Sequence, residues 1–146
     1  MRPRGIVELL LVEDNPGDAR LLEEVLKEEG IAAALRVARD GIEALDALRA
    51  PGARLPDLVL LDLNLPRKNG REFLSEMKAD EALRRIPVVV LTGSVAEEDV
   101  ARAYELHANC YITKPDTLDG FVAAVRGIVA FWFGVARLPG GGAGGR

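Results

Sequence analysis

The sequence of 146 residues is acidic, with a formal net charge of -4, and 49% of its residues are hydrophobic. This length and composition favour one globular domain with a single core, and the charge argues against a nucleic-acid partner. The single cysteine excludes an internal disulfide. The chain has no run of about 18 apolar residues and no cleavage-site pattern near its start, so we expect a cytoplasmic protein with no membrane partner.

Five short, mostly apolar segments alternate with segments of helical periodicity along the chain. Apolar runs without polar alternation indicate strands that are covered on both faces. The expected strands are residues 6–12, 34–38, 57–62, 87–92 and 109–112. The expected helices begin near Pro16, Asp40, Asn69, Ser94 and Thr117, with Ser94 as the N-cap of the fourth.

This alternation predicts an α/β fold in which helices cover both faces of a parallel sheet. The doubly wound, five-stranded order 2-1-3-4-5 is the one we expect. Residues 6–130 would form the domain, residues 131–138 an aromatic extension at its carboxyl end, and residues 139–146 a disordered, glycine-rich tail.

Polar side chains stand where four of the predicted strands end: Glu13, Asp14, Asp62, Thr92 and Lys114. The carboxyl ends of parallel strands meet at one edge, so the carboxylates there repel unless a cation or a proton lies among them. Oxygen ligands of this kind suit Mg²⁺ or Mn²⁺. Asp62 is the favoured nucleophile, because a carboxylate can accept a phosphoryl group. Lys114 and Thr92 would then neutralise and hydrogen-bond the phosphoryl oxygens.

Longer motifs around these residues resemble a known family. The motifs are residues 12–18, 63–72 and 109–115 and the ending Phe131, Trp132 and Phe133. Together with the strand-end residues, they make residues 7–128 similar to the receiver domain of two-component response regulators, which has a flavodoxin-like fold. The similarity is greatest to single-domain receivers that serve phytochrome-type histidine kinases.

The resemblance implies a phosphoacceptor and a metal site. Asp62 would accept the phosphoryl group from a phosphohistidine of a partner kinase, here a bacteriophytochrome. Asp14 would bind Mg²⁺ directly and Glu13 mainly through water, and the backbone carbonyl of Asn64 would complete the protein's share of the metal ligands.

The resemblance also implies a response to phosphorylation. Lys114 would pair with the phosphoryl group, and the family's cis peptide before Pro115 would aim this lysine at the site. Thr92 and Tyr111 would form a switch pair, in which the hydroxyl moves toward the phosphoryl oxygen and draws the aromatic ring inward.

Three classes of protein stay open at this point. A single-domain response regulator would be phosphorylated on Asp62 and would act by protein–protein interaction, since no effector motif follows the last helix. A Mg²⁺-dependent phosphohydrolase with an aspartyl-phosphate intermediate usually needs a second acid two residues after the nucleophile, where Asn64 stands. A phosphate-independent adaptor with the same fold would lack the acids.

The end of the last predicted helix is apolar around most of its circumference. Exposed aromatic residues usually mark a contact, so Phe131, Trp132 and Phe133 predict a homodimer through the fourth helix, the fifth strand and the last helix. The alternative is an arm that folds back on its own domain. A kinase would dock beside the first helix, near Arg20, Leu21 and Glu24, and the downstream partner is not identified.

Overall fold

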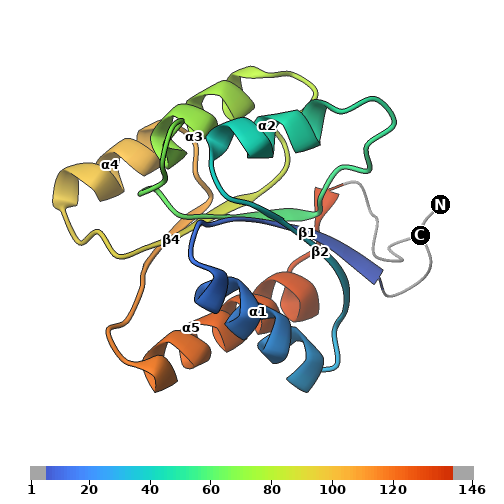
Figure 1. Cartoon of the computed structure of the whole chain (residues 1–146), viewed down its shortest axis with the longest axis vertical. Helices are drawn as coiled ribbons and strands as arrows, with labels where there is room; N and C mark the ends of the chain where they lie inside the picture. The colour runs from blue at the N-terminus through green and yellow to red at the C-terminus, as the bar shows by residue number, and fades with distance from the viewer. Residues whose placement is uncertain (1–5, 140–146) are drawn as a thin grey trace.

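The computed structural model describes residues 6–139 as a five-stranded sheet between two layers of helices (Figure 1). The elements in chain order are β1 (Ile6–Val12), α1 (Pro16–Glu28), β2 (Ala32–Ala38), α2 (Gly41–Arg49), β3 (Leu58–Leu61), α3 (Gly70–Ala79), β4 (Val88–Thr92), α4 (Glu97–Glu105), β5 (Cys110–Thr113), α5 (Leu118–Ala130) and the π-helix η1 (Phe131–Val135). All strand pairs are parallel, in the order β2-β1-β3-β4-β5. The predicted fold and strand order are therefore confirmed.

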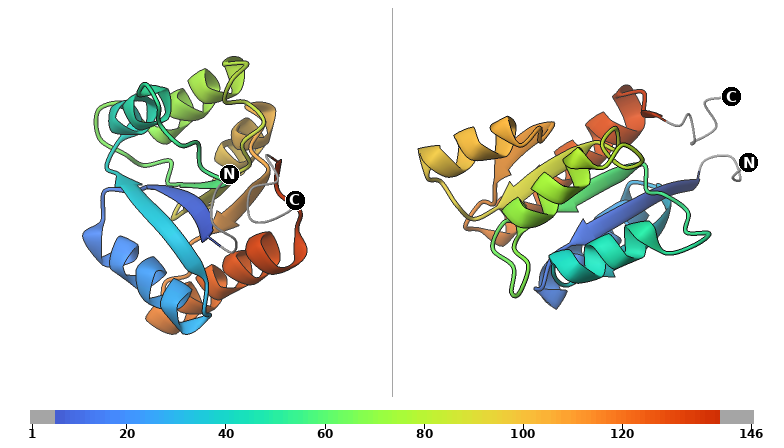
Figure 2. Two further views of the ribbon diagram at one scale, coloured as in Figure 1. Left: turned by 90° about the vertical axis from the view of Figure 1, so that its right-hand side faces the viewer. Right: turned by 90° about the horizontal axis from the view of Figure 1, so that it is seen from above.

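The two helical layers cover opposite faces of the sheet. Helices α2, α3 and α4 lie on one face, and α1 and α5 lie on the other, as Figures 1 and 2 show. Each layer encloses its own hydrophobic cluster. Alternate residues of β3 enter different clusters, with Val59 and Leu61 in the first and Leu58 and Leu60 in the second. This double burial explains why β3 is apolar throughout, since successive strand residues point to opposite faces.

Side chains of the loops fix the starts of several helices. Asn15 caps α1 by accepting hydrogen bonds from the backbone N–H groups of Gly17 and Asp18, and Asn69 forms a capping box with Glu72 at the start of α3. The predicted N-cap role of Ser94 is wrong. Helix α4 begins three residues later, at Glu97, after the N-cap Ala96, and has no side-chain cap. The Ser94 hydroxyl donates to Asp99 and accepts from the backbone N–H of Ala96, which lies before the helix.

The carboxyl-terminal helix is apolar enough to pass a test for a membrane span. Residues Leu118–Val135 form an 18-residue segment with a mean hydropathy of 1.6. The apolar side chains Phe121, Val125, Ile128 and Val129 are, however, buried in the second cluster, against the sheet. The segment is therefore explained as a core helix of this domain.

The helix continues beyond α5 into η1, which carries the predicted aromatic extension. Trp132 and Phe133 are partly buried against the second cluster, whereas Phe131 is 50% exposed and Val135 is 76% exposed. The rings of Phe131 and Trp132 meet edge to face, with centroids 5.3 Å apart. Apart from Pro139, the tail predicted for residues 139–146 lies outside the described residues.

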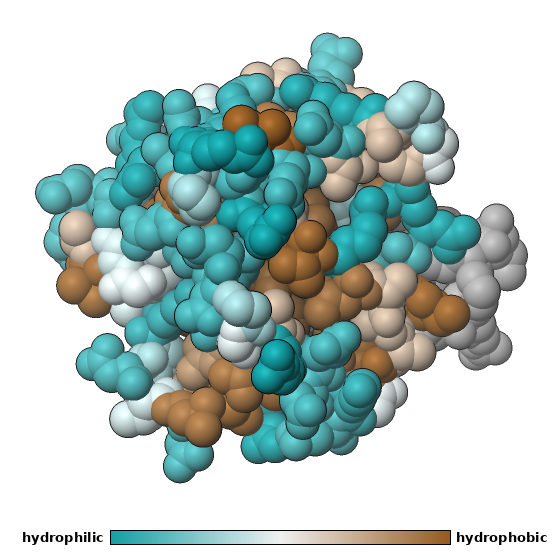
Figure 3. All heavy atoms as spheres, in the orientation of Figure 1, coloured by the Kyte–Doolittle hydropathy of each residue, from teal (hydrophilic) through white to brown (hydrophobic). Residues whose placement is uncertain are grey.

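The edge strand β2 leaves apolar side chains in contact with solvent. Val37 of this strand is 45% exposed. Figure 3 shows apolar atoms between the two helical layers, where β1 and β2 run in Figure 1. The opposite edge of the sheet is formed by β5, whose residues Cys110, Tyr111 and Ile112 are half-buried.

Candidate functional site

The carboxyl edge of the sheet brings the predicted strand-end residues together. Lys114 Nζ lies 2.7 Å from Glu13 Oε1 and 3.3 Å from Asp62 Oδ2. Thr92 Oγ1 donates to Asp62 Oδ1 at 2.7 Å. Strands β1, β3 and β4 adjoin one another, which explains how residues far apart in the sequence share this edge.

The carboxylate of Asp62 is held in one orientation. Its Oδ1 accepts hydrogen bonds from the Thr92 hydroxyl and, at 3.0 Å, from the backbone N–H of Asn64. The residue is only 7% exposed, and its own N–H donates to the carbonyl of Val12. A nearly buried carboxylate whose donors come from three sides is prepared for a reaction at its oxygen atoms.

Carboxylates of Glu13, Asp14 and Asp62 form a group with ligand atoms within 4.8 Å of one another. Burial raises the pKa of Glu13 to about 7, and the charge of Asp62 adds to the rise, while the hydrogen bond from Lys114 opposes it. A divalent cation would stabilise the ionised forms of all three groups. The donor set therefore fits the predicted Mg²⁺ or Mn²⁺ site, because these hard cations prefer oxygen ligands.

The ammonium group of Lys114 donates to three carboxylates. Besides Glu13 and Asp62 it contacts Asp18, with Nζ 2.8 Å from Asp18 Oδ2. Burial by itself would lower the pKa of Lys114, but the hydrogen bonds to Asp18 and Glu13 outweigh it, so the pKa is raised. The lysine is charged throughout the physiological range, as a partner for phosphoryl oxygens must be.

The cis peptide implied by the resemblance is not present. The peptide bond before Pro115 is trans in this structure, so that expectation is wrong. Lys114 is instead directed by its backbone, whose N–H donates to the carbonyl of Thr92 at 2.7 Å, and by the three carboxylates around its ammonium group.

Sequence reasoning missed Asp18 as a residue of the site. The one available signal was its position in the first turn of α1, directly after the acidic pair and Pro16. Helical geometry alone does not say which side chains of that turn point toward the sheet edge. The structure decides this through the contact with Lys114.

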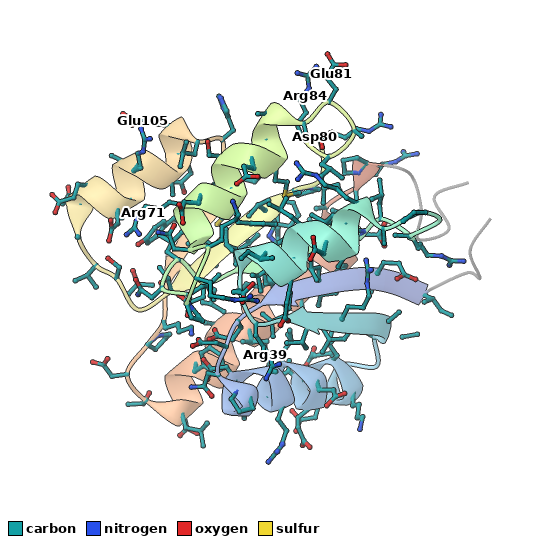
Figure 4. The ribbon with its side chains drawn as sticks, turned by 45° about the horizontal axis from the view of Figure 1, so that its top comes forward. Arg39, Arg71, Asp80, Glu81, Arg84 and Glu105 are labelled. Carbon is teal, nitrogen blue, oxygen red and sulfur yellow. The ribbon has the colours of Figure 1, made fainter. Side chains whose placement is uncertain are left out.

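The loop between β4 and α4 links Thr92 to Tyr111 indirectly. The Tyr111 hydroxyl donates to the carbonyl of Ser94 at 2.9 Å, two residues beyond Thr92. Asp99 accepts from the Ser94 hydroxyl and, at 2.6 Å, from Arg71 of α3, which Figure 4 labels beside α4. The backbone of this loop therefore joins Thr92 to the carbonyl group that the Tyr111 hydroxyl contacts.

A groove between α1 and α5 lies next to the site. Its lining includes Arg20, Leu21 and Glu24, the residues suggested for kinase docking by their position in the sequence. Asp18 and further residues of both helices also line it: Val25, Glu28, Val122 and Arg126. Arg126 of α5 bridges to Glu28 of α1 at 2.7 Å and closes one part of this groove.

Comparison with known proteins identifies the class. The family model described as the response regulator receiver domain matches residues 9–126. The chain therefore belongs to this family, whose members are phosphoacceptor signalling proteins, and it is not assigned to the phosphohydrolase class or to an adaptor that lacks the acids.

Individual relatives resemble the chain over nearly its whole length. It is 49% identical to the response regulator Rcp1 of Synechocystis over 90% of this chain and 92% of the relative. The crystal structure of Mn²⁺-bound Rcp1 matches with a TM-score of 0.88 and 47% identity, over 91% of this chain and 99% of the other. That of the phosphorylated cyanobacterial phytochrome response regulator RcpA matches with a TM-score of 0.87 and 47% identity, over 91% and 98%.

Proposed function

We propose that this protein is a single-domain response regulator that is phosphorylated on Asp62. The observation that carries the proposal is the nearly buried Asp62 carboxylate, which contacts Thr92 and Lys114 and shares a metal-sized cluster with two other acids. Its output is protein–protein interaction. A cytoplasmic location goes with this function, because kinases make phosphohistidine from ATP there.

Each residue of the site performs a different part of the phosphoryl transfer. An oxygen of Asp62 attacks phosphorus as the P–N bond of the donor breaks, and the electron pair stays on the imidazole nitrogen. Lys114 neutralises charge on the phosphoryl oxygens, and Thr92 exchanges its bond to Asp62 for one to a phosphoryl oxygen. A divalent cation held by Glu13, Asp14, Asp62 and the Asn64 carbonyl supplies the remaining positive charge when bound.

Acetyl phosphate with Mg²⁺ tests this proposal without a kinase. Intact-mass measurement is expected to show one phosphoryl adduct on the wild type and none on Asp62→Asn. The control is Asp46→Asn, which removes an exposed carboxylate from α2 and should leave the adduct unchanged. An adduct that survives Asp62→Asn would contradict the assignment.

The kinase partner is of the phytochrome type. Support comes from RcpA, named as a phytochrome response regulator, and from its 47% identity over 91% of this chain. Phosphotransfer from candidate phytochrome-type kinases, in light and in darkness, is expected to label Asp62 in a light-dependent manner. Equal labelling under both conditions by every kinase tested would remove the phytochrome link.

The kinase docks in the groove between α1 and α5, beside the phosphorylation site. Leu21 lies in this groove and is half-buried, with a polar rim around it. Leu21→Arg is expected to slow phosphorylation by the kinase while leaving phosphorylation by acetyl phosphate at the wild-type rate. Equal slowing with both donors would mean that the substitution disturbs the site itself and not a docking surface.

A homodimer forms through α4, β5 and α5, extended by residues 131–138. Its support is the exposed apolar surface of Phe131 and Val135, at 50% and 76% exposure, on a helix end that the domain does not cover. The competing arrangement, an arm folded on its own domain, is favoured by Trp132 and Phe133, which pack partly against the second cluster.

A further inference from the structure

Asp18 contacts the lysine of the site but does not belong to its metal cluster. Its Oδ2 lies 2.8 Å from Lys114 Nζ, closer than the 3.3 Å between Nζ and Asp62 Oδ2. The cluster of described carboxylates that could share a metal ion contains Glu13, Asp14 and Asp62. Two of the three partners of Lys114, Glu13 and Asp62, thus also belong to the candidate metal cluster, and Asp18 is the third.

This difference between Asp18 and the other two partners of Lys114 becomes important when a cation is bound. A lysine ammonium has three N–H donors, and here each one has a carboxylate partner. A bound metal ion would compete with the ammonium group for the negative charge of Glu13 and Asp62. Phosphorylation would change Asp62 further, because one carboxylate oxygen becomes the bridging oxygen of an acyl phosphate and the side chain loses its own negative charge. Asp18 is the one partner of Lys114 that neither metal binding nor phosphorylation of Asp62 would take away.

The fold holds Asp18 where it can do this. Its backbone N–H donates to the side chain of Asn15, which caps α1, so the first turn of the helix is fixed. The side chains of Asp18 and Lys114 are 22% and 18% exposed, which leaves their ion pair largely shielded from water. A charge-assisted hydrogen bond that is shielded from water fixes the positions of its two groups more closely than an exposed ion pair does.

We propose that Asp18 is a positioning residue, which keeps the Lys114 ammonium group at the reaction site while the metal ion and the phosphoryl group occupy its other partners. The inference rests on the proposed phosphorylation of Asp62. It assigns Asp18 no contact with the reacting atoms. Its effect on the reaction is exerted through Lys114.

The test compares three variants with the wild type at saturating Mg²⁺ and acetyl phosphate. Asp18→Asn keeps the size of the side chain and removes its charge, and Asp18→Glu keeps the charge. Glu23→Gln removes one charge from an exposed residue of the same helix, whose carboxylate is not one of the three partners of Lys114. The phosphorylation rate is expected to fall about tenfold in Asp18→Asn, to recover in large part in Asp18→Glu and to stay unchanged in Glu23→Gln.

A second measurement observes Lys114 directly. Ammonium protons give NMR signals when hydrogen bonds slow their exchange with water, and the signal of Lys114 is assigned by its loss in Lys114→Arg. This signal is expected in the metal-loaded wild type and in Glu23→Gln, and it should broaden in Asp18→Asn. Thermal unfolding of each variant, expected at the wild-type temperature, separates this effect from a general loss of structure.

Three outcomes would overturn the inference: a wild-type rate in Asp18→Asn, a loss that disappears as Mg²⁺ is raised to saturation, or an Asp18→Glu variant as slow as Asp18→Asn. The second would mean that Asp18 acts on the metal site and not on Lys114. Failure of the wild type to form any adduct would instead reject the proposed function, so the two failures are distinguishable.

Discussion

At the scale of single residues, the site depends on one buried hydrogen bond. The Thr92 hydroxyl is fully buried and donates to Asp62 at 2.7 Å. In the unmodified protein this bond holds the orientation of the Asp62 carboxylate, and a phosphoryl group would offer the same hydroxyl a new acceptor. Under the proposed phosphorylation of Asp62, Thr92 is therefore expected to contribute both to the stability of the unmodified domain and to its response.

Replacing Thr92 separates these contributions. Thr92→Ala removes a buried hydrogen bond to a carboxylate, so the free energy of unfolding is expected to fall by about 1–2 kcal/mol. Thr92→Ser keeps the hydroxyl and should retain most of that stability. Urea unfolding at neutral pH measures both variants. Equal stability of the alanine and serine variants would show that the hydroxyl contributes nothing.

At the scale of elements, the start of helix α3 packs against the backbone of Asp62. Helix α3 starts at Gly70, whose N–H donates to the carbonyl of Leu63 at 3.1 Å. A Cβ atom at Gly70 would lie 2.4 Å from the carbonyl oxygen of Asp62. The start of α3 is therefore packed directly on the strand end that carries the acceptor.

Gly70→Ala is expected to lower the free energy of unfolding by about 2–3 kcal/mol, because backbone atoms of a packed region must move apart. The matched control is Gly127→Ala in α5, where a Cβ atom would meet open space. That substitution should stabilise the protein by up to about 1 kcal/mol through helix propensity. Calorimetry of both variants checks the contrast, and similar effects at the two positions would refute it.

The loop between β3 and α3 is tied to the start of α2 by an ion pair. Arg67 Nη2 lies 2.5 Å from Asp40 Oδ2. Asp40 also caps α2, because its Oδ1 accepts a hydrogen bond from the backbone N–H of Glu43. Burial alone would raise the pKa of Asp40, but the hydrogen bonds from Glu43 and Arg67 outweigh it and hold the pKa below its ordinary value. A carboxylate of this kind stabilises the fold above its unfolded pKa, and the stabilisation is lost as the pH falls through the folded value.

Arg67→Ala is therefore expected to be less stable than the wild type at pH 7, with a difference that shrinks as the pH falls below about 3.9. The difference should be modest, because the Arg67 side chain is 57% exposed and its charge is screened. Arg39→Ala breaks only an exposed pair at 3.8 Å and should have little effect at any pH. Thermal unfolding as a function of pH follows both variants. A difference independent of pH would exclude Asp40 as its cause.

At the scale of the whole molecule, the proposed output surface lies away from the acceptor. Helix α5 contributes four buried residues to the core and then continues into η1, where Phe131 and Val135 face solvent. One continuous helix thus serves first as part of the core and then as a candidate contact between subunits.

Sedimentation tests the homodimer. A chain truncated after Ala130 is expected to be monomeric at concentrations where the full chain is dimeric. Because truncation also removes Trp132 and Phe133 from the second cluster, the variant Phe131→Ser, Val135→Ser is the sharper comparison: it leaves both of those residues in place. If both variants remain as dimeric as the full chain, the extension is not part of the interface.

The sequence alone determined the fold and most of the site. Alternation of apolar and helical segments predicted the five strands, their order and the shared edge for Glu13, Asp62, Thr92 and Lys114. The pattern is clearest for β1, β3 and β4, because burial on both faces makes these strands apolar throughout or nearly so. Helix starts were less certain. Ser94 looks like an N-cap in the sequence, yet in the structure its hydroxyl is bonded to Asp99, and α4 begins three residues further on.

Only the tertiary structure decided which side chains meet across elements. The contact of Asp18 with Lys114, the packing of Gly70 on Asp62 and the pair of Arg67 with Asp40 each join segments from different elements. Such contacts depend on how helices are seated against the sheet, and residue spacing within one element does not encode that placement. The structure also has a trans peptide before Pro115, where the family resemblance predicted a cis peptide.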